Sequence, residues 1–159
     1  MKLTATMKMI LRKSPLLPIL YSKVVLNTTL EHIIPVSYMR NHIHARDVHN
    51  IYSTTDKMNQ LRCNYEFDYL PRSCIKYENN MICKKNKIIY PREEDRGIIA
   101  RSILYMCDEY NYTNYGNIKL YKIWNKKYKP TEKEVLHNEI GYLTQGKYNK
   151  YISNYTLNI

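Results

Sequence analysis

The sequence contains no long apolar run, no internal repeat and no Gly/Ser-rich linker. A helix that spans a bilayer needs about 20 consecutive apolar residues, so no membrane span is expected. Pro15 and Pro18 interrupt the first 21 residues, where Lys and Arg are scattered among apolar side chains. This is a poor match to a secretory signal peptide, so an intracellular location is favoured over secretion. A length of 159 residues suits one compact domain.

Acidic residues are few: 14 Asp and Glu stand against 25 Lys and Arg, which gives a formal charge of +11. Such an excess favours polyanionic partners, either nucleic acid or an anionic membrane surface. Lys, Asn, Ile and Tyr are abundant, as AT-rich coding DNA also produces, so the charge alone is weak support for nucleic-acid binding. Phe and Trp occur once each against 17 Tyr, whose rings pack in a core while their hydroxyls reach a polar boundary.

The pattern of apolar, capping and turn residues predicts an α+β fold that is mostly helical. In the first half we expect a strand over residues 30–36 that is stopped by Pro35, and an extended segment over 47–52. A helix should follow from about residue 55 to 64, capped by Ser53, Thr54 or Thr55. Asn79 and Asn80 predict a hairpin. In the second half we expect three helices. The first is opened by Pro91, and its apolar side carries Ile99, Ile103, Met106 and Tyr110. The second covers residues 116–127 with an apolar stripe of Leu120, Ile123 and Trp124, and the third runs from Thr131 to Gly146 with apolar positions at Val135, Leu136, Ile140 and Leu143.

The chemistry is concentrated in a carboxylate beside a histidine, Glu31 and His32, with amides downstream at Asn50, Asn59 and Asn64. Carboxylate and amide oxygens suit Mg²⁺ or Ca²⁺, and imidazole is well placed to move a proton near neutral pH. Hydrolysis of a phosphodiester needs a base to activate water and a cation to offset developing charge. Adjacent residues on a regular strand point to opposite faces, so the Glu31 and His32 side chains can converge only at a strand end, bulge or twist.

Several ordered blocks of the sequence resemble the endonuclease I family of nonspecific nucleases, which belong to the ββα-metal, or His-Me finger, superfamily. The resemblance covers about three quarters of the chain, from residue 31 to about residue 152. The blocks are Glu-His-Ile-Ile-Pro at 31–35, Asp-Val-His-Asn-Ile at 47–51, Met-Asn-Gln-Leu-Arg-Cys-Asn-Tyr at 58–65, Arg-Gly-Ile-Ile-Ala-Arg at 96–101 with Tyr105 and Met106, Trp-Asn at 124–125, and Gln-Gly-Lys-Tyr-Asn at 145–149.

This resemblance implies a ββα-metal core with additional packed helices, and a role for each matching residue. His32 is expected to act as general base, and Glu31 and Asn59 to bind one divalent cation, normally Mg²⁺ with Mn²⁺ or Ca²⁺ as alternatives. The expected reaction is nonspecific cleavage of DNA, with RNA as a further substrate, to leave 5′-phosphate ends. Four residues are expected to support the site without reacting: Asp47, His49, Asn50 and Asn64.

The chain also departs from the family pattern. Residues 1–30 match it poorly, so we place the nuclease domain at residues 31–155. The family's phosphate-binding arginine has only positional candidates, Arg40 and Arg46, while Arg101 either anchors a loop or contacts phosphate. His137 stands where the family tends to have arginine.

Two other functional classes compete with a nuclease. A basic protein with this fold can bind nucleic acid without cleaving it. His42 and His44 can instead form a structural zinc site with His49 or Cys63, although no Cys-x-x-Cys pair is present and the spacing fits no standard module. The four cysteines permit two disulfides without requiring them. For the basic and aromatic segment 119–129, a solvated helix face is the preferred interpretation and a DNA-facing surface is the alternative.

Overall fold

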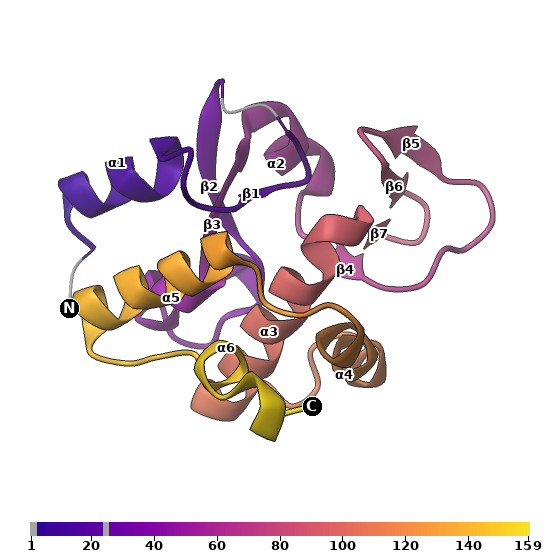
Figure 1. Ribbon diagram of the computed structural model, residues 1–159. Helices are drawn as coiled ribbons and strands as arrows, with labels where there is room; N and C mark the ends of the chain where they lie inside the picture. The colour runs from indigo at the N-terminus through magenta and orange to yellow at the C-terminus, as the bar shows by residue number, and fades with distance from the viewer. Residues whose placement is uncertain (1–2, 24–25) are drawn as a thin grey trace.

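The computed structural model describes residues 3–23 and 26–159 of the chain. Two small sheets pack against a group of helices, and the long helix α3 runs through the middle of the molecule (Figure 1). This arrangement confirms an α+β class with several packed helices. None of the described helices has the length and apolarity to cross a membrane. The elements are α1 (Ala5–Lys13), β1 (Ile19–Leu20), β2 (Thr28–His32), β3 (Ile51–Thr55), α2 (Asp56–Arg62), β4 (Glu66–Phe67), β5 (Ile75–Tyr77), β6 (Asn80–Cys83), β7 (Ile88–Tyr90), α3 (Glu93–Tyr110), α4 (Ile118–Lys127), α5 (Glu132–Gln145) and α6 (Lys150–Ser153), with short 3-10 turns η1 (Val36–Tyr38), η2 (His44–Arg46), η3 (Val48–Asn50) and η4 (Tyr155–Leu157).

The first sheet has the order β1-β3-β2, in which β3 is parallel to β1 and antiparallel to β2. The strand predicted over 30–36 is shifted, because β2 ends at His32, before the proline. The extended segment predicted over 47–52 is wrong at its start. There the Asp47 carboxylate accepts from the His49 N–H and caps the turn η3, so β3 begins only at Ile51. The predicted order of strand, strand and helix is nevertheless present.

Helix α2 follows β3 directly, and the choice among three capping residues falls on Thr55. Its hydroxyl accepts a hydrogen bond from the Met58 N–H at 3.3 Å, which satisfies one of the free amides of the first turn. The helix ends at Arg62, shortly before the predicted end near residue 64, because Cys63 has a positive φ of 53°. Met58 and Arg62 are buried, so this short helix turns one side toward the sheet and the core.

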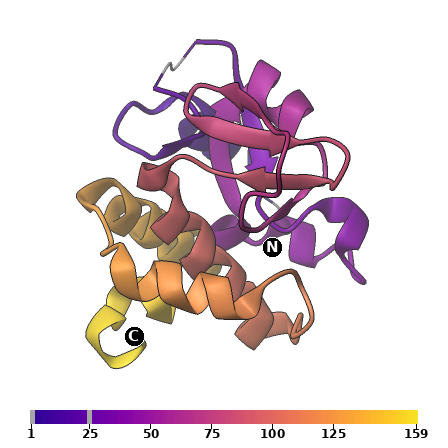
Figure 2. The same ribbon diagram turned by 90° about the vertical axis from the view of Figure 1, so that its right-hand side faces the viewer.

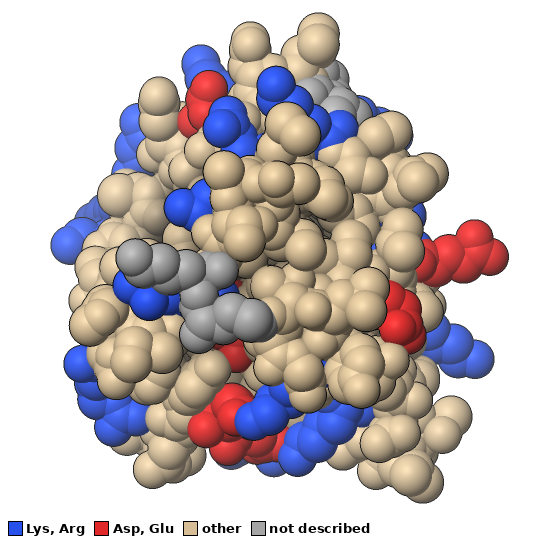
Figure 3. Space-filling view, turned by 90° about the vertical axis from the view of Figure 1, so that its left-hand side faces the viewer, with Lys and Arg blue, Asp and Glu red and all other residues tan. Residues whose placement is uncertain are grey.

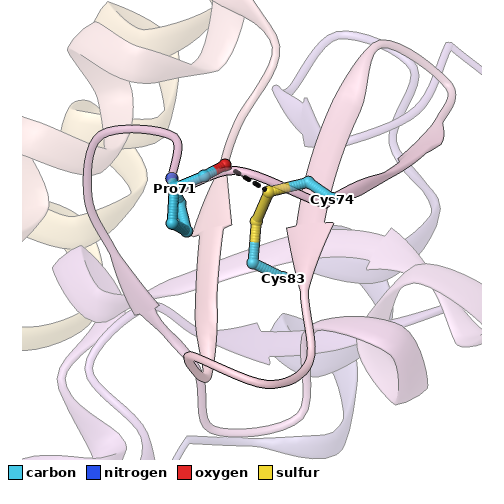
Figure 4. Close-up of a disulfide and its surroundings, with 3 residues drawn as sticks. All are labelled: Pro71, Cys74 and Cys83. Atoms are coloured by element: carbon cyan, nitrogen blue, oxygen red, sulfur yellow. Dashed lines mark hydrogen bonds between the residues drawn. A yellow bond between two sulfur atoms is a disulfide. The ribbon is translucent and has the colours of Figure 1, made fainter.

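The second sheet has the order β4-β7-β6-β5 and lies at the other end of α3 from α6 (Figures 1 and 2). Its hairpin turn lies at Glu78 and Asn79, both with positive φ, and Asn80 begins β6, which confirms the predicted hairpin. A disulfide joins Cys74 to Cys83 across this hairpin, with the Pro71 carbonyl oxygen 3.1 Å from the Cys74 sulfur (Figure 4). The exposed Cys63 and the buried Cys107 are free, so one disulfide is present.

The predicted bounds of the later helices are largely confirmed, but the predicted apolar face of α4 is wrong at one position and that of α5 is mostly wrong. On α4, Leu120 and Trp124 are buried as expected, whereas Ile123 is 53% exposed and Tyr121 takes its place in the core. On α5, Leu143 is 78% exposed. The residues that α5 buries are instead Glu134, His137, Asn138 and Gly141.

Polar partners explain why α5 buries its polar side. Glu134 receives two hydrogen bonds from the Arg101 guanidinium, at 2.6 and 2.7 Å. His137 donates from Nε2 to the Ile51 carbonyl at 2.8 Å and stacks on Tyr52. Gly141 packs against the His49 ring so closely that a Cβ would collide with it. Buried polar groups are tolerated where their hydrogen bonds are satisfied, and a scan for apolar periodicity does not detect them.

The N-terminal residues belong to the same body as the rest of the chain. Helix α1 packs on the face of the first sheet opposite α2, where Leu11 and Leu17 form a small core with Val48 and Ile51. The proposed boundary between residues 30 and 31 falls inside β2.

Candidate active site

The central feature of the candidate site is that Glu31 and His32 lie on opposite faces of the first sheet. Strand β2 pairs in regular register with β3, Glu31 opposite Tyr52 and His32 opposite Ile51. No bulge or twist brings the two side chains together. Glu31 therefore faces the main core on the side of α2, and His32 faces the side covered by α1.

The His32 ring is half-buried and held by one hydrogen bond. Its Nε2 lies 2.9 Å from the carbonyl oxygen of Ala45. A carbonyl oxygen only accepts, so Nε2 carries the proton and Nδ1 keeps its lone pair. No described residue forms a hydrogen bond to Nδ1. Burial lowers the pKa of His32 below its ordinary value, although the bond to Ala45 acts in the opposite direction. The result is a neutral imidazole with one free basic nitrogen.

His32 forms part of the wall of a cavity of about 480 Å³ between α1, β2 and η2. The remaining wall is apolar except for two cationic side chains, Lys8 and Arg46, and no Asp or Glu lines it. Arg46 also lines a smaller neighbouring cavity of about 150 Å³, together with Asp47 and Lys147. A cavity whose only charged lining residues are two cations, with a histidine beside them, is suited to an anion.

Glu31, 2% exposed, is held by an ion pair with Arg62. Its Oε1 accepts hydrogen bonds from Arg62 Nη1 at 2.6 Å and from the Tyr21 hydroxyl at 3.2 Å. Arg62 also donates to the carbonyl oxygens of His32 and Ile33, so it ties the end of β2 to α2. Burial raises the pKa of the Glu31 carboxyl, while the Arg62 guanidinium acts in the opposite direction.

The expected cation ligands do not form an open site in this arrangement. Asn59 lies one helical turn before Arg62, half-buried, and no hydrogen bond joins its side chain to another described residue. The oxygens of Glu31 and Asn59 suit Mg²⁺ chemically, but the Arg62 guanidinium already binds Glu31 Oε1 at 2.6 Å, so a cation at this carboxylate would lie beside a positive charge. A buried divalent ion beside a guanidinium would be strongly repelled. The two residues therefore do not fit a cation as they are placed here.

The histidine cluster proposed for zinc is dispersed. His44 hydrogen-bonds through Nδ1 to the Tyr112 hydroxyl and stacks on Tyr110, while His42 is exposed. Within residues 3–23 and 26–159, no three His, Cys, Asp or Glu side chains are grouped to hold a metal.

Three of the four expected supporting residues form a polar frame behind η3. Asp47 Oδ2 accepts from the hydroxyls of Tyr105 at 2.9 Å and Tyr110 at 2.6 Å, and its Oδ1 accepts from Gln145. Asn50 exchanges two hydrogen bonds with the backbone of Ile34, at 2.8 and 3.0 Å.

His49 completes this frame. It donates from Nε2 to the Lys147 carbonyl at 2.7 Å and stacks edge-on against Tyr105. Asn64 is exposed after the end of α2 and takes no part in the frame.

The three candidate phosphate-binding arginines differ in availability. Arg101 is buried and committed to Glu134, so it anchors α5 to α3. Arg40 is exposed but donates to the carbonyl oxygens of Tyr110 and Asn111. Arg46 is exposed, and its guanidinium has no hydrogen-bond or ion-pair partner among the described residues. Arg46 alone lies in the wall of the His32 cavity.

Sequence reasoning assigned no role to three residues that contribute to this region: Lys8, Tyr21 and Arg62. The last lies within the block at 58–65, between the expected cation ligand Asn59 and the expected supporting residue Asn64, so its position there could have marked it as part of the site. The other two lie in the first 30 residues, which carry no recognisable pattern.

Comparison with known proteins places this geometry in context. A family profile described as Endonuclease I matches residues 24–156, which leaves α1 and β1 outside the match. The chain is 30% identical over 111 residues to Endonuclease-1 of Buchnera aphidicola subsp. Baizongia pistaciae (strain Bp), covering 67% of this chain and 45% of that protein. It is 32% identical over 109 residues to Endonuclease-1 of Buchnera aphidicola subsp. Acyrthosiphon pisum (strain APS), covering 67% of this chain and 44% of that protein. The chain thus spans less than half the length of these curated relatives. Because the profile matches most of its residues, the chain belongs to the endonuclease I family.

Proposed function

We propose that this protein is an endonuclease that hydrolyses phosphodiester bonds in nucleic acid, with His32 as the general base. The observation that carries the proposal is the neutral His32 imidazole in the wall of a cavity lined by two cations, with its Nε2–H held by Ala45 and its Nδ1 without a hydrogen bond to any described residue. A general base must be unprotonated and within reach of its substrate, and burial favours the neutral form. The relatives' name, Endonuclease-1, supports the same reaction class.

In the proposed reaction, His32 Nδ1 takes a proton from a water molecule in the cavity. The water oxygen then forms a bond to phosphorus as the bond to the 3′ oxygen breaks, and that oxygen receives a proton from solvent. The products carry a 5′-phosphate and a 3′-hydroxyl. The Arg46 guanidinium offsets charge that develops on the phosphate oxygens during this step.

We also propose that β2, β3 and α2 form the ββα finger of the superfamily, since they follow one another as strand, strand and helix. A divalent cation, Mg²⁺ with Mn²⁺ or Ca²⁺ as alternatives, stays a prediction of the family resemblance. When bound, such an ion would supply electrostatic stabilisation of the leaving oxygen. Because Glu31 is engaged by Arg62, the residues as placed do not fit the ion, and no step above depends on it.

The substrate is proposed to be the sugar–phosphate backbone of DNA, with RNA as a further substrate, read without regard to sequence. The chain has a formal charge of +11, and backbone contacts carry no sequence information. Cleavage of unrelated duplexes should therefore proceed at similar rates.

A plasmid-nicking assay tests the proposal. Wild-type protein is incubated with supercoiled plasmid in Mg²⁺, Mn²⁺, Ca²⁺ or EDTA, alongside His32→Ala and the matched control His42→Ala, a histidine that is exposed and outside the cavity wall. Loss of the base should reduce the rate by about 10²–10⁴, and the control should cleave like wild type. Full activity in a folded His32→Ala protein would remove His32 from the reaction.

A second candidate function is nucleic-acid binding without cleavage. The Glu31–Arg62 ion pair favours it, because it ties up one of the two residues expected to hold the cation. Under this alternative the wild-type protein shifts a labelled duplex in a gel but nicks no plasmid with any of the three cations.

A further inference from the structure

Helix α1 lies outside the region matched by the family profile but is fastened to the strand that carries His32 (Figure 1). The Arg12 guanidinium donates to the Thr28 carbonyl at the start of β2, from Nε at 3.2 Å and from Nη2 at 2.9 Å. The Ser53 hydroxyl on β3 donates to the Arg12 carbonyl at 2.9 Å, and Leu11 is fully buried against the sheet. The C-terminal half of α1 is therefore fixed relative to the two central strands.

One turn before Arg12, the same helix presents Lys8 to the cavity that contains His32. Residues four apart lie on the same side of a helix, so the bonds made by Arg12 also fix the face of α1 from which Lys8 projects. Arg46 reaches the same cavity from η2. Neither cation has a hydrogen-bond or ion-pair partner among the described residues, and no carboxylate shares the cavity wall. Figure 3 shows the face that carries α1, with Lys and Arg side chains over its left and upper parts and also along its lower edge, where Asp and Glu lie beside them.

Lys8 and Arg46 are both exposed, so water screens their charges, but two cations that line one cavity without a carboxylate favour an anion there. An exposed lysine on a helix usually points into solvent, and Lys13, on the same helix, is exposed and outside the cavity. The combination of Lys8, Arg46 and the free Nδ1 of His32 has the chemistry of a phosphodiester site, in which cations hold the non-bridging oxygens and the imidazole faces the water.

We propose that Lys8 and Arg46 together bind the phosphodiester backbone at the His32 cavity, so that α1 is a substrate-binding element of this chain. The inference rests on the proposed function and adds to it a cation from outside the family match. Because the helix is anchored through Arg12, the backbone of Lys8 has a fixed position beside the cavity before substrate arrives.

The test compares Lys8→Gln and Arg46→Gln with Lys13→Gln, which removes the same charge from the same helix outside the cavity. Cleavage of a short labelled duplex DNA gives kcat and KM, and binding of that duplex to the His32→Ala protein is measured at several salt concentrations. Lys8→Gln should raise KM roughly fivefold and reduce the slope of log affinity against log salt by about 0.9. Lys13→Gln should change KM by less than about twofold, as expected for a screened surface charge.

The outcomes separate the inference from the proposed function. If wild type cleaves and Lys8→Gln matches Lys13→Gln in both KM and salt slope, the role of Lys8 is wrong while the nuclease assignment stands. If wild type binds the duplex without cleaving it, the proposed reaction is wrong, and the loss of affinity in Lys8→Gln alone still supports the binding role. If wild type neither cleaves nor binds, both proposals fall.

Discussion

At the scale of single residues, the environment of His32 determines the pH range in which it can act as a base. Its pKa is lowered from 6.5 by burial. Because only the neutral imidazole accepts a proton, activity should be present above the folded-state pKa and lost as pH falls through it. We expect kcat/KM to reach half its plateau below pH 6.5, measured with a short labelled duplex between pH 4.5 and 8. A midpoint above 6.5 would contradict the assignment of this histidine as a buried neutral base.

The Glu31–Arg62 pair makes a second prediction at the residue scale. Removing one partner of a buried ion pair leaves an uncompensated charge, which costs about 3–5 kcal/mol. Glu31→Ala and Arg62→Ala should each lower the free energy of unfolding by about that amount in EDTA, whereas Glu66→Ala, on the exposed edge of β4, should change it by less than about 0.5 kcal/mol. Urea unfolding measures all three.

A double mutant completes this experiment. Glu31→Ala with Arg62→Ala removes both charges, so the loss should be much smaller than the sum of the single losses. If Glu31→Ala in EDTA is as stable as wild type, the carboxylate is not held by Arg62 in solution and is free to serve as a cation ligand.

The same pair shows what sequence reasoning can reach at this scale. Because side chains alternate along a strand, the sequence predicts that adjacent residues on a regular strand point to opposite faces. The regular register of β2 places Glu31 and His32 on opposite faces in this way. The partner of Glu31 was not predictable, because Arg62 lies 31 positions away and reaches it only after β2, β3 and α2 have packed.

At the scale of elements, capping residues predicted helix bounds well, and apolar spacing predicted burial less well. Thr131 and Gly146 mark the ends of α5 as expected, with Gly146 in the left-handed region at φ 74°. The buried side of α5 was missed because Glu134 and His137 find partners on other elements, and their burial depends on those tertiary bonds.

His137 provides the prediction that belongs to α5. Burial lowers its pKa to about 3, from an ordinary 6.5. Between these two pH values the unfolded chain binds a proton at this histidine and the folded chain does not. As pH falls below 6.5, the contribution of His137 to the free energy of unfolding therefore decreases by up to about 1.4 kcal/mol for each pH unit. His137→Gln keeps a donor for the Ile51 carbonyl but does not titrate.

Urea unfolding of wild type and His137→Gln at pH 7 and pH 4.5 measures this difference. Wild type should be the more stable of the two at pH 7, and its advantage should shrink or reverse at pH 4.5. Other carboxylates and histidines titrate equally in both proteins, so they cancel in the comparison. An advantage that is the same at both pH values would show that His137 does not remain neutral in the folded protein.

At the scale of the whole molecule, the surplus of positive charge is distributed over faces with different expected roles. Helix α4 carries exposed Lys122 and Lys126, exposed Lys129 follows shortly after its end, and the helix lies on the opposite side of the molecule from α1 (Figure 1). Its buried side is largely apolar, with Leu120 and Trp124 in the core, so Lys122 and Lys126 form the solvated face of an ordinary amphipathic helix. Nucleic acid bound at the His32 cavity would be remote from them.

The salt dependence of binding tests whether net charge or its location matters. Replacing Lys122, Lys126 and Lys129 with Gln removes three charges, whereas Lys8→Gln with Arg46→Gln removes two. If affinity followed net charge alone, the triple variant would show the flatter plot of log affinity against log salt. Counterion release depends instead on the phosphates contacted, at about 0.9 in slope for each one in duplex DNA. We therefore expect the double variant to lose close to 2 in slope and the triple variant less than 1, measured with the His32→Ala protein and a labelled duplex. A larger loss in the triple variant would move the binding surface to α4 and leave the His32 cavity without its substrate.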